Sequence, residues 1–212
     1  VKLDSDGSIP ESLALGDNLI IIGTVNMDET TYTFSPKVLD RANVLEFDAV
    51  SVSEYLSDSG IVYSPSGDVA YLQDSTAGLE CRHMSAREII AEMREFVPDG
   101  IIDGMVRDLG DIQVRMSGMG LPFAYRTLDE VMRFMYVAWN YVGRGDFHDW
   151  KRYLDAQIRQ KILPKIHGNS SILPELRAFR DMCAIEGYVR SEQRIAHMAS
   201  VLESQRYVSF NS

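Results

Sequence analysis

Residues 18–47, NLIIIGTVNMDETTYTFSPKVLDRANVLEF, decide the predicted fold of this chain. Residues 19–25 form an apolar run rich in β-branched side chains, which is typical of a strand buried on both faces of a parallel sheet. Asn26 follows directly, at the predicted carboxyl end of this strand. Because ligands bind outside this edge in open α/β sheets, a carboxamide at this position can hold a water or a phosphate oxygen.

The second half of the same stretch predicts a short helix and another strand. Ser35 suits the N-cap and Pro36 the first helical position, so we expect a helix through residues 37–42. Residues 43–47 are the next predicted strand. The whole stretch therefore predicts an α/β unit.

A set of phrases covers most of the chain outside residues 50–120. They are IPESL (9–13), IIIGTVNMDET (20–30), FSPKVLDRANVLEF (34–47), PFAYRTLDEVMRFM (122–135), QKILPKIHG (160–168) and SEQRIAHMASVLESQRYVSF (191–210). With these phrases the chain resembles the AAA+ ATPases, and within them the McrB-type nucleotide-hydrolysing subunits of modified-cytosine restriction systems.

The resemblance implies a role for three residues. Asn26 looks like sensor 1, Arg41 like the arginine finger that reaches the nucleotide of a neighbouring subunit, and Arg126 like the sensor 2 arginine of the lid. It also implies a full-length parent that binds ATP or GTP with magnesium and assembles into a ring. A nuclease subunit and DNA are the further partners that it implies.

Two expected motifs of this family do not occur in the sequence. The chain has no G-x-x-x-x-G-K-[ST] phosphate loop and no Walker B strand with its magnesium-binding acid. Asp28 and Glu29 mimic Walker B, but the preceding Asn26 and the following S-P-x-x-x-D-R phrase fit sensor 1 better. We therefore expect the carboxyl-terminal part of a longer ATPase, inactive by itself and without a tightly bound nucleotide.

Arg41 and Arg126 each have a simpler interpretation from the residues alone. Arg41 stands beside Asp40, where an intrahelical or surface ion pair would contribute little. Arg126 stands beside Thr127, the predicted N-cap of a helix, where the dipole and free N–H groups favour an anion. From the residues alone, a surface arginine, or one paired with a local acid, is the favoured interpretation of Arg126. The resemblance at residues 122–135 reverses that preference, and it favours the nucleotide roles of both arginines.

The fold prediction is an α/β remnant of an AAA+ sheet followed by a mostly α-helical lid domain. Residues 1–49 are assigned to the core, residues 50–84 to an insertion with a hairpin near residues 60–72, and residues 85–212 to the lid. Helix starts and ends inside the lid are predicted from local signals. The predicted helix starts are capping boxes at Ser85-x-x-Glu88 and Thr127-x-x-Glu130 and N-caps at Asp146 and Ser191. We also expect a helix over 101–109 with a looser segment after it, and a helix over 173–185 that ends at Gly187. The apolar tail at 207–210 is expected to add a strand or to dock on the lid.

The composition excludes several classes of protein. The 212 residues are 45% hydrophobic, enough for one large or two small domains, and no apolar run approaches the length of a membrane span. A net charge of -10 argues against a large nonspecific nucleic-acid or membrane surface. Cys81 and Cys183 lie far apart, which disfavours a disulfide framework or zinc site and favours a reducing cytoplasm. The scattered histidines predict no metal site.

Two functions from different classes follow. The first is the carboxyl-terminal portion of an AAA+ motor subunit that works on DNA with a nuclease partner. The second is a non-catalytic interaction or oligomerisation module derived from a truncated ATPase. An upstream reading frame with a phosphate loop would favour the first.

Overall fold

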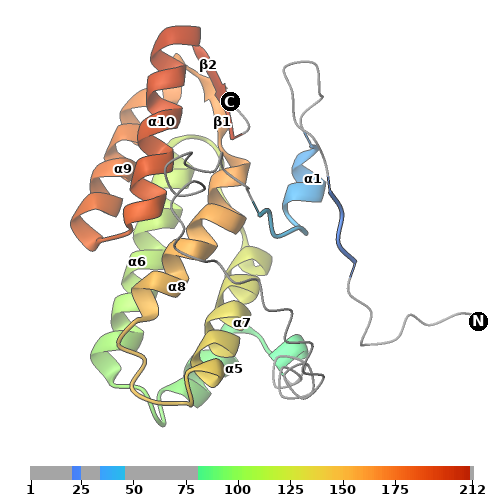
Figure 1. Cartoon of the computed structure of the whole chain (residues 1–212), viewed down its shortest axis with the longest axis vertical. Coiled ribbons are helices and arrows are strands. Elements are labelled where there is room, and N and C mark those ends of the chain that lie inside the picture. The colour runs from blue at the N-terminus through green and yellow to red at the C-terminus, as the bar shows by residue number, and fades with distance from the viewer. Residues whose placement is uncertain (1–20, 25–33, 46–80, 211–212) are drawn as a thin grey trace, which may run out of the picture. The chain divides into compact units, whose positions relative to one another are not determined.

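The computed structural model describes residues 21–24, 34–45 and 81–210. The chain divides into two compact units, Val1–Thr31 and Tyr32–Ser212, and the helical domain belongs to the second (Figure 1). No helix in the described residues is long and apolar enough to cross a membrane.

The described residues of the second unit are mostly helical and include one pair of short strands (Figure 1). Its elements are α1 (Pro36–Leu39), η1 (Cys81–His83), α5 (Ala86–Met93), α6 (Asp99–Gly118), α7 (Tyr125–Tyr141), α8 (Trp150–Gln157), η2 (Ile158–Ile162), η3 (Leu163–Lys165), β1 (His167–Asn169), η4 (Ser170–Ile172), α9 (Leu173–Glu186), α10 (Val189–Gln205) and β2 (Tyr207–Ser209). Of these, η2 is a π-helix, and η1, η3 and η4 are 3-10 turns.

The helices enclose one apolar core. α9 and α10 pack along each other, α5 packs on α7, and α7 also contacts α8, while α6 packs against α9. Trp139, Phe179 and Tyr188 are among the largest side chains that are completely buried. Burying a large apolar side chain stabilises a fold by about 1.5–3 kcal/mol relative to leaving it exposed, so these contacts hold the helices together.

Several local predictions are confirmed. Ser85 and Glu88 form the reciprocal capping box at the start of α5. α9 ends at Gly187, whose φ of 82° lies in the left-handed region that glycine adopts without a steric penalty. The apolar tail forms β2, which pairs antiparallel with β1 in the register His167–Ser209 and Asn169–Tyr207.

The predicted start of α7 is wrong. The helix begins at Tyr125 with Ala124 at its N-cap, so Thr127 lies inside the first turn. Thr127 is buried, and its hydroxyl donates to Oδ1 of Asp40 at 3.4 Å. Because the Thr127 hydroxyl bonds to a residue far away in the sequence, Thr127 does not cap the helix. Arg126 therefore belongs to the first turn of α7 rather than to the segment before it.

The predicted end of the preceding helix, at residue 109, is also wrong, since α6 is continuous from Asp99 to Gly118. Gly110 lies in its middle and is exposed. Glycine destabilises a helix by roughly 0.5–1 kcal/mol relative to alanine. The burial of the apolar face outweighs that cost; its members include Ile102, Met105, Ile112 and Met116.

Two predicted N-caps are replaced by other residues. α8 begins after Asp149, not Asp146, and α10 begins after Tyr188, not Ser191. Ser191 is buried in the first turn of α10, where its hydroxyl donates to the carboxylate of Asp155 at 2.5 Å. The capping anion for α10 therefore comes from α8 and has no local sequence signal.

The described residues of the two predicted core strands are not strands. Residues 21–24 and 43–45 have no strand assignment, and Ile21 and Ile22 are 81% and 84% exposed. A strand needs a paired neighbour, and the described residues provide none for either segment. The helical domain is thus established, while the hairpin predicted near residues 60–72 lies outside the described residues.

Candidate functional site

The turn that follows α1 is the starting point of the candidate site. The carbonyl of Ser35 accepts hydrogen bonds from the N–H groups of Val38 and Leu39, at 2.9 and 3.2 Å. The carbonyl of Val38 then accepts from the N–H of Arg41 at 3.0 Å. The short helix and its turn therefore have a defined backbone, and Asp40 and Arg41 are adjacent on it.

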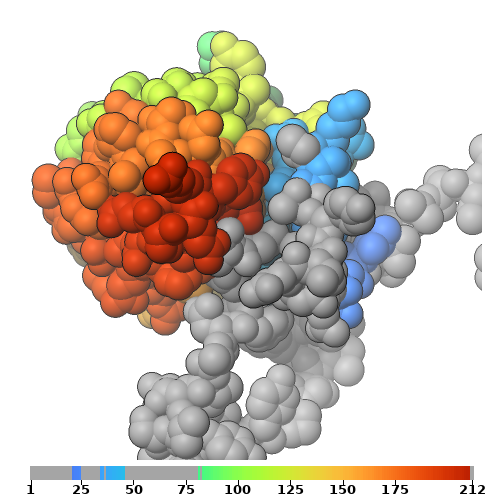
Figure 2. All heavy atoms as spheres, turned by 90° about the horizontal axis from the view of Figure 1, so that it is seen from above, coloured from blue at the N-terminus to red at the C-terminus, as the bar shows by residue number. Residues whose placement is uncertain are grey.

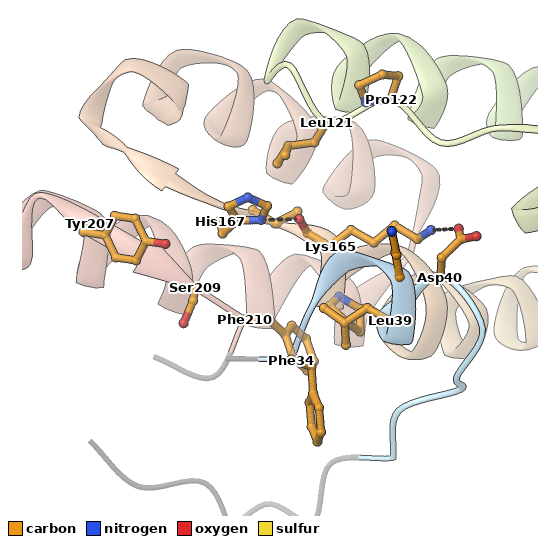
Figure 3. Close-up of a pocket in the computed structure, with 13 residues that line it drawn as sticks. Phe34, Leu39, Asp40, Leu121, Pro122, Lys165, His167, Tyr207, Ser209 and Phe210 are labelled. Carbon is orange, nitrogen blue, oxygen red and sulfur yellow. Dashed lines mark hydrogen bonds and ion pairs between the residues drawn. The ribbon is translucent and has the colours of Figure 1, made fainter. Parts of the chain in front are cut away.

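Four side chains converge on the carboxylate of Asp40 or on the backbone beside it. We call Asp40, Arg126, Thr127, Lys161 and Lys165 the Asp40 cluster. Lys165 Nζ lies 2.6 Å from Asp40 Oδ1 (Figure 3). Nη1 of Arg126 lies 3.6 Å from Oδ2 of the same carboxylate. Lys165 also donates to the Thr127 hydroxyl at 3.1 Å. The carboxylate thus contacts two cations and the first turn of α7.

This environment stabilises the ionised form of Asp40. The hydrogen bond from Lys165 lowers the pKa of the Asp40 carboxyl below its ordinary value of 3.8, and burial opposes that shift. The charges of Lys165, Arg126 and Lys161 lower the pKa further. An anion near the amino end of a helix is also favoured by the helix dipole. Asp40 is therefore ionised at neutral pH and attaches the α1 turn to α7.

Lys161 attaches the same turn through its backbone. Its side chain is fully buried, and Nζ donates to the carbonyls of Asp40 and Ala42 at 2.8 and 3.1 Å. Nζ also forms an ion pair with Glu130 of α7. Segment 34–45 accordingly lies against the helical domain, as the light-blue atoms in Figure 2 show.

A pocket of about 400 Å³ opens beside the Asp40 cluster (Figure 3). Its walls come from segment 34–45, η3, β1 and β2, and they include the rings of Phe34, Tyr207 and Phe210. Lys37, Lys165 and His167 add basic groups. Nδ1 of His167 donates to the carbonyl of Lys165 at 2.9 Å, since a carbonyl only accepts. This lining suits an apolar group with a negative charge at its edge.

Comparison with known proteins identifies the helical domain. Residues 81–207 match a protein family described as a domain of unknown function, DUF8727. The chain belongs to the DUF8727 family. No curated protein and no solved structure matches the chain. The matched residues of the DUF8727 domain run from η1 to the start of β2, so Arg126, Lys161 and Lys165 lie inside it and Asp40 lies outside.

Two of the predicted site residues, Arg126 and Arg41, lie beside Asp40, where segment 34–45 contacts the DUF8727 domain. Arg126 bonds to Asp40 with 54% of its side chain exposed. Arg41 is exposed and adjoins Asp40, and within the described residues its guanidinium has no ion pair or hydrogen bond. Asn26 lies outside the described residues. The structure therefore brings Arg126 and the turn that carries Arg41 together, and leaves the prediction for Asn26 untested.

The sequence prediction missed three members of the cluster as functional candidates. Asp40 was considered only as a local partner of Arg41, and Lys161 and Lys165 were not singled out. A signal was present: the two lysines are four positions apart in QKILPKIHG, in which most other residues are apolar. A lysine in such a segment needs a buried partner, and that partner is the α1 turn.

The described residues provide no evident metal centre. No group of three His, Cys, Asp or Glu side chains among them is arranged to hold a metal ion. The polar groups of the cluster are three cations and one hydroxyl around a carboxylate, so the anion that they bind in this structure is the Asp40 side chain.

Proposed function

We propose that this chain is the carboxyl-terminal portion of an AAA+ NTPase motor subunit, in which the DUF8727 domain is the lid. One observation carries the proposal: the exposed Arg41 sits on a turn that the helical domain holds in two ways. The backbone carbonyls on either side of Arg41 accept from Lys161 of η2, and the Asp40 carboxylate pairs with Arg126 in the first turn of α7. Because its backbone is already held, this turn can present Arg41 to a neighbouring subunit with little further loss of backbone freedom.

Arg41 is proposed to act on the nucleotide of the neighbouring subunit. A guanidinium stabilises the charge that spreads over the transferring phosphoryl group, and such a finger raises turnover by about 10³–10⁵-fold. Its effect is therefore expected on the rate of hydrolysis rather than on nucleotide affinity. The exposure of Arg41 and its lack of an ion pair among the described residues support this role.

Arg126 is proposed to bind a phosphate of the nucleotide held by its own subunit. An arginine can bind a phosphate through two parallel hydrogen bonds, and the amino end of a helix favours an anion in the same place. The contact with Asp40, at 3.6 Å, is long enough and exposed enough to be exchanged for a phosphate. Asn26 is proposed to hold the attacking water, as the sequence resemblance to sensor 1 implies.

The nucleotide itself is proposed to be ATP or GTP with magnesium. The phosphate loop and the magnesium-binding carboxylate do not occur in this sequence, so the proposal assigns both to a preceding segment of a longer subunit. The isolated chain is then expected to show no nucleotide turnover. Work on DNA, ring assembly and a nuclease partner are part of the proposal and are supported by the sequence resemblance.

Replacement of Arg41 tests the proposal. In a ring-forming protein that contains this chain, Arg41→Ala is expected to lower turnover at least 10³-fold and to leave nucleotide affinity within a few-fold of the unmodified protein. Arg87→Ala, at an exposed arginine of α5, is the matched control and should leave turnover unchanged. Full turnover in Arg41→Ala would contradict the proposal and favour the alternative of a non-catalytic interaction module.

A further inference from the structure

Lys161 is a fully buried cation among apolar side chains. It lies in the π-helix η2, where Ile158 and Ile162 are also completely buried. A buried ammonium is costly unless each N–H group finds a partner. Here Nζ has one acceptor for each of its N–H groups: the carbonyls of Asp40 and Ala42 and the carboxylate of Glu130.

Two of those acceptors flank Arg41 on the backbone. The carbonyl of Asp40 precedes it and the carbonyl of Ala42 follows it, at 2.8 and 3.1 Å from Nζ. The next contact comes from Val44, whose N–H donates to the carbonyl of Gln160 at 3.0 Å. The backbone on both sides of Arg41 is therefore bonded to residues 160–161, while the Arg41 side chain is exposed.

The local structure of η2 explains why the Gln160 carbonyl is available to Val44. Its usual helical donor would be residue 164, but that residue is Pro164, which has no N–H. The helix widens here, and the N–H of Leu163 bonds to the carbonyl of Ile158 in the π-helical pattern. Such π-turns are rare and occur frequently at functional sites.

The third acceptor of Lys161 connects it to α7. Glu130 lies four positions after Arg126, and residues with that spacing share one face of a helix. Arg126 contacts the side chain of Asp40 directly, and Glu130 contacts Lys161, which in turn bonds to the backbone of the turn. The same face of α7 is therefore connected to the turn once directly and once through Lys161.

We propose that Lys161 is the positioning residue for Arg41: it holds the Arg41 backbone in fixed register with α7, so that a movement of the DUF8727 domain is transmitted to Arg41. This inference rests on the proposed role of Arg41 in phosphoryl transfer. It adds a residue inside the DUF8727 domain that acts on the reaction without contacting the nucleotide.

The test removes the ammonium and keeps the length of the side chain. In the ring-forming protein, Lys161→Met is expected to lower the turnover of ATP or GTP about 100-fold, the loss typical of a catalytic group displaced by about 1 Å, with nucleotide affinity unchanged. Introduced together with Arg41→Ala, it should lower turnover no further than Arg41→Ala alone, because both changes remove the same contribution.

A matched control and a structural readout accompany this variant. Lys151→Met removes another lysine–glutamate pair of the domain, with Glu186 at 2.6 Å, and should leave turnover unchanged. Amide hydrogen exchange of Ala42 and Val44 should become faster in Lys161→Met and stay slow in Lys151→Met. If Lys161→Met does not fold, Glu130→Leu combined with Lys161→Met avoids an unpaired, partly buried carboxylate and still removes the bonds to the two carbonyls.

The outcomes separate this inference from the proposed function. Normal turnover in Lys161→Met, with Arg41→Ala inactive, would overturn the positioning role and leave the proposed function intact. An equal loss from Lys161→Met in the presence and absence of Arg41 would also overturn it, because it would show a general effect on the fold. Full turnover in Arg41→Ala would overturn both proposals together.

Discussion

Lys165 donates a 2.6 Å hydrogen bond to Oδ1 of Asp40, a residue 125 positions earlier in the chain. The bond connects the DUF8727 domain to the turn that carries Arg41. Since one partner is a carboxylate whose pKa is lowered by this contact, the attachment of the turn should depend on pH.

The first prediction is that acid loosens this attachment. A carboxyl whose pKa is lower in the folded state contributes stability that is fully present above its unfolded value, here 3.8, and that is lost as the pH falls below it through the folded value. Amide exchange of Arg41 and Ala42, corrected for the intrinsic pH dependence, should therefore be constant above about pH 5 and accelerate below pH 3.8. Asp40→Asn should abolish this pH dependence, and an unchanged profile in Asp40→Asn would contradict the assignment.

The second prediction concerns the capping of α10 by Asp155. Its carboxylate accepts from the N–H groups of Arg190 and Ser191 at 3.0 and 2.9 Å. Asp155→Ala removes these bonds and should lower the free energy of unfolding by about 2 kcal/mol, measured by urea denaturation. Asp149→Ala is the control, because Asp149 stands at the N-cap of α8 without a side-chain capping bond. Equal effects from both variants would contradict the capping role.

The third prediction compares two glycines in different backbone conformations. Gly187 has a φ of 82°, which strains any residue with a Cβ, so Gly187→Ala should lower the free energy of unfolding by about 1 kcal/mol. Gly110 lies in the middle of α6 with no atom within 4 Å of an added Cβ, so Gly110→Ala should raise it by about 0.5–1 kcal/mol. A destabilising Gly110→Ala would indicate that the helix is broken where the sequence prediction ended it.

The sequence predicts those parts of the fold whose signals are local. The Ser85–Glu88 capping box and the glycine after α9 act within a few residues, and both are confirmed. Thr127 and Ser191 were predicted as caps by the same rule and are not caps. In each case a carboxylate from a distant part of the chain takes the hydroxyl, and a local pattern cannot contain that information.

The candidate site depends almost entirely on distant contacts. Lys161 bonds to residues 121 and 119 positions away, and no spacing rule connects them. The sequence did indicate Arg41 and Arg126, because their neighbours match family phrases. It did not indicate that Asp40 connects the turn that carries Arg41 to the helix that carries Arg126, because that connection depends on how the helices pack.

The most direct test of the account is the mixing of inactive subunits of the ring-forming protein. One subunit carries Arg41→Ala, and the other lacks its magnesium-binding carboxylate but keeps Arg41. If Arg41 acts on the neighbouring subunit's nucleotide, the mixture should regain turnover at interfaces where an intact nucleotide site meets an intact Arg41. As a control, a ring in which every subunit carries both changes should stay inactive. Failure of the first mixture to regain turnover, with the two subunits shown to assemble together, would contradict the role of Arg41 in trans.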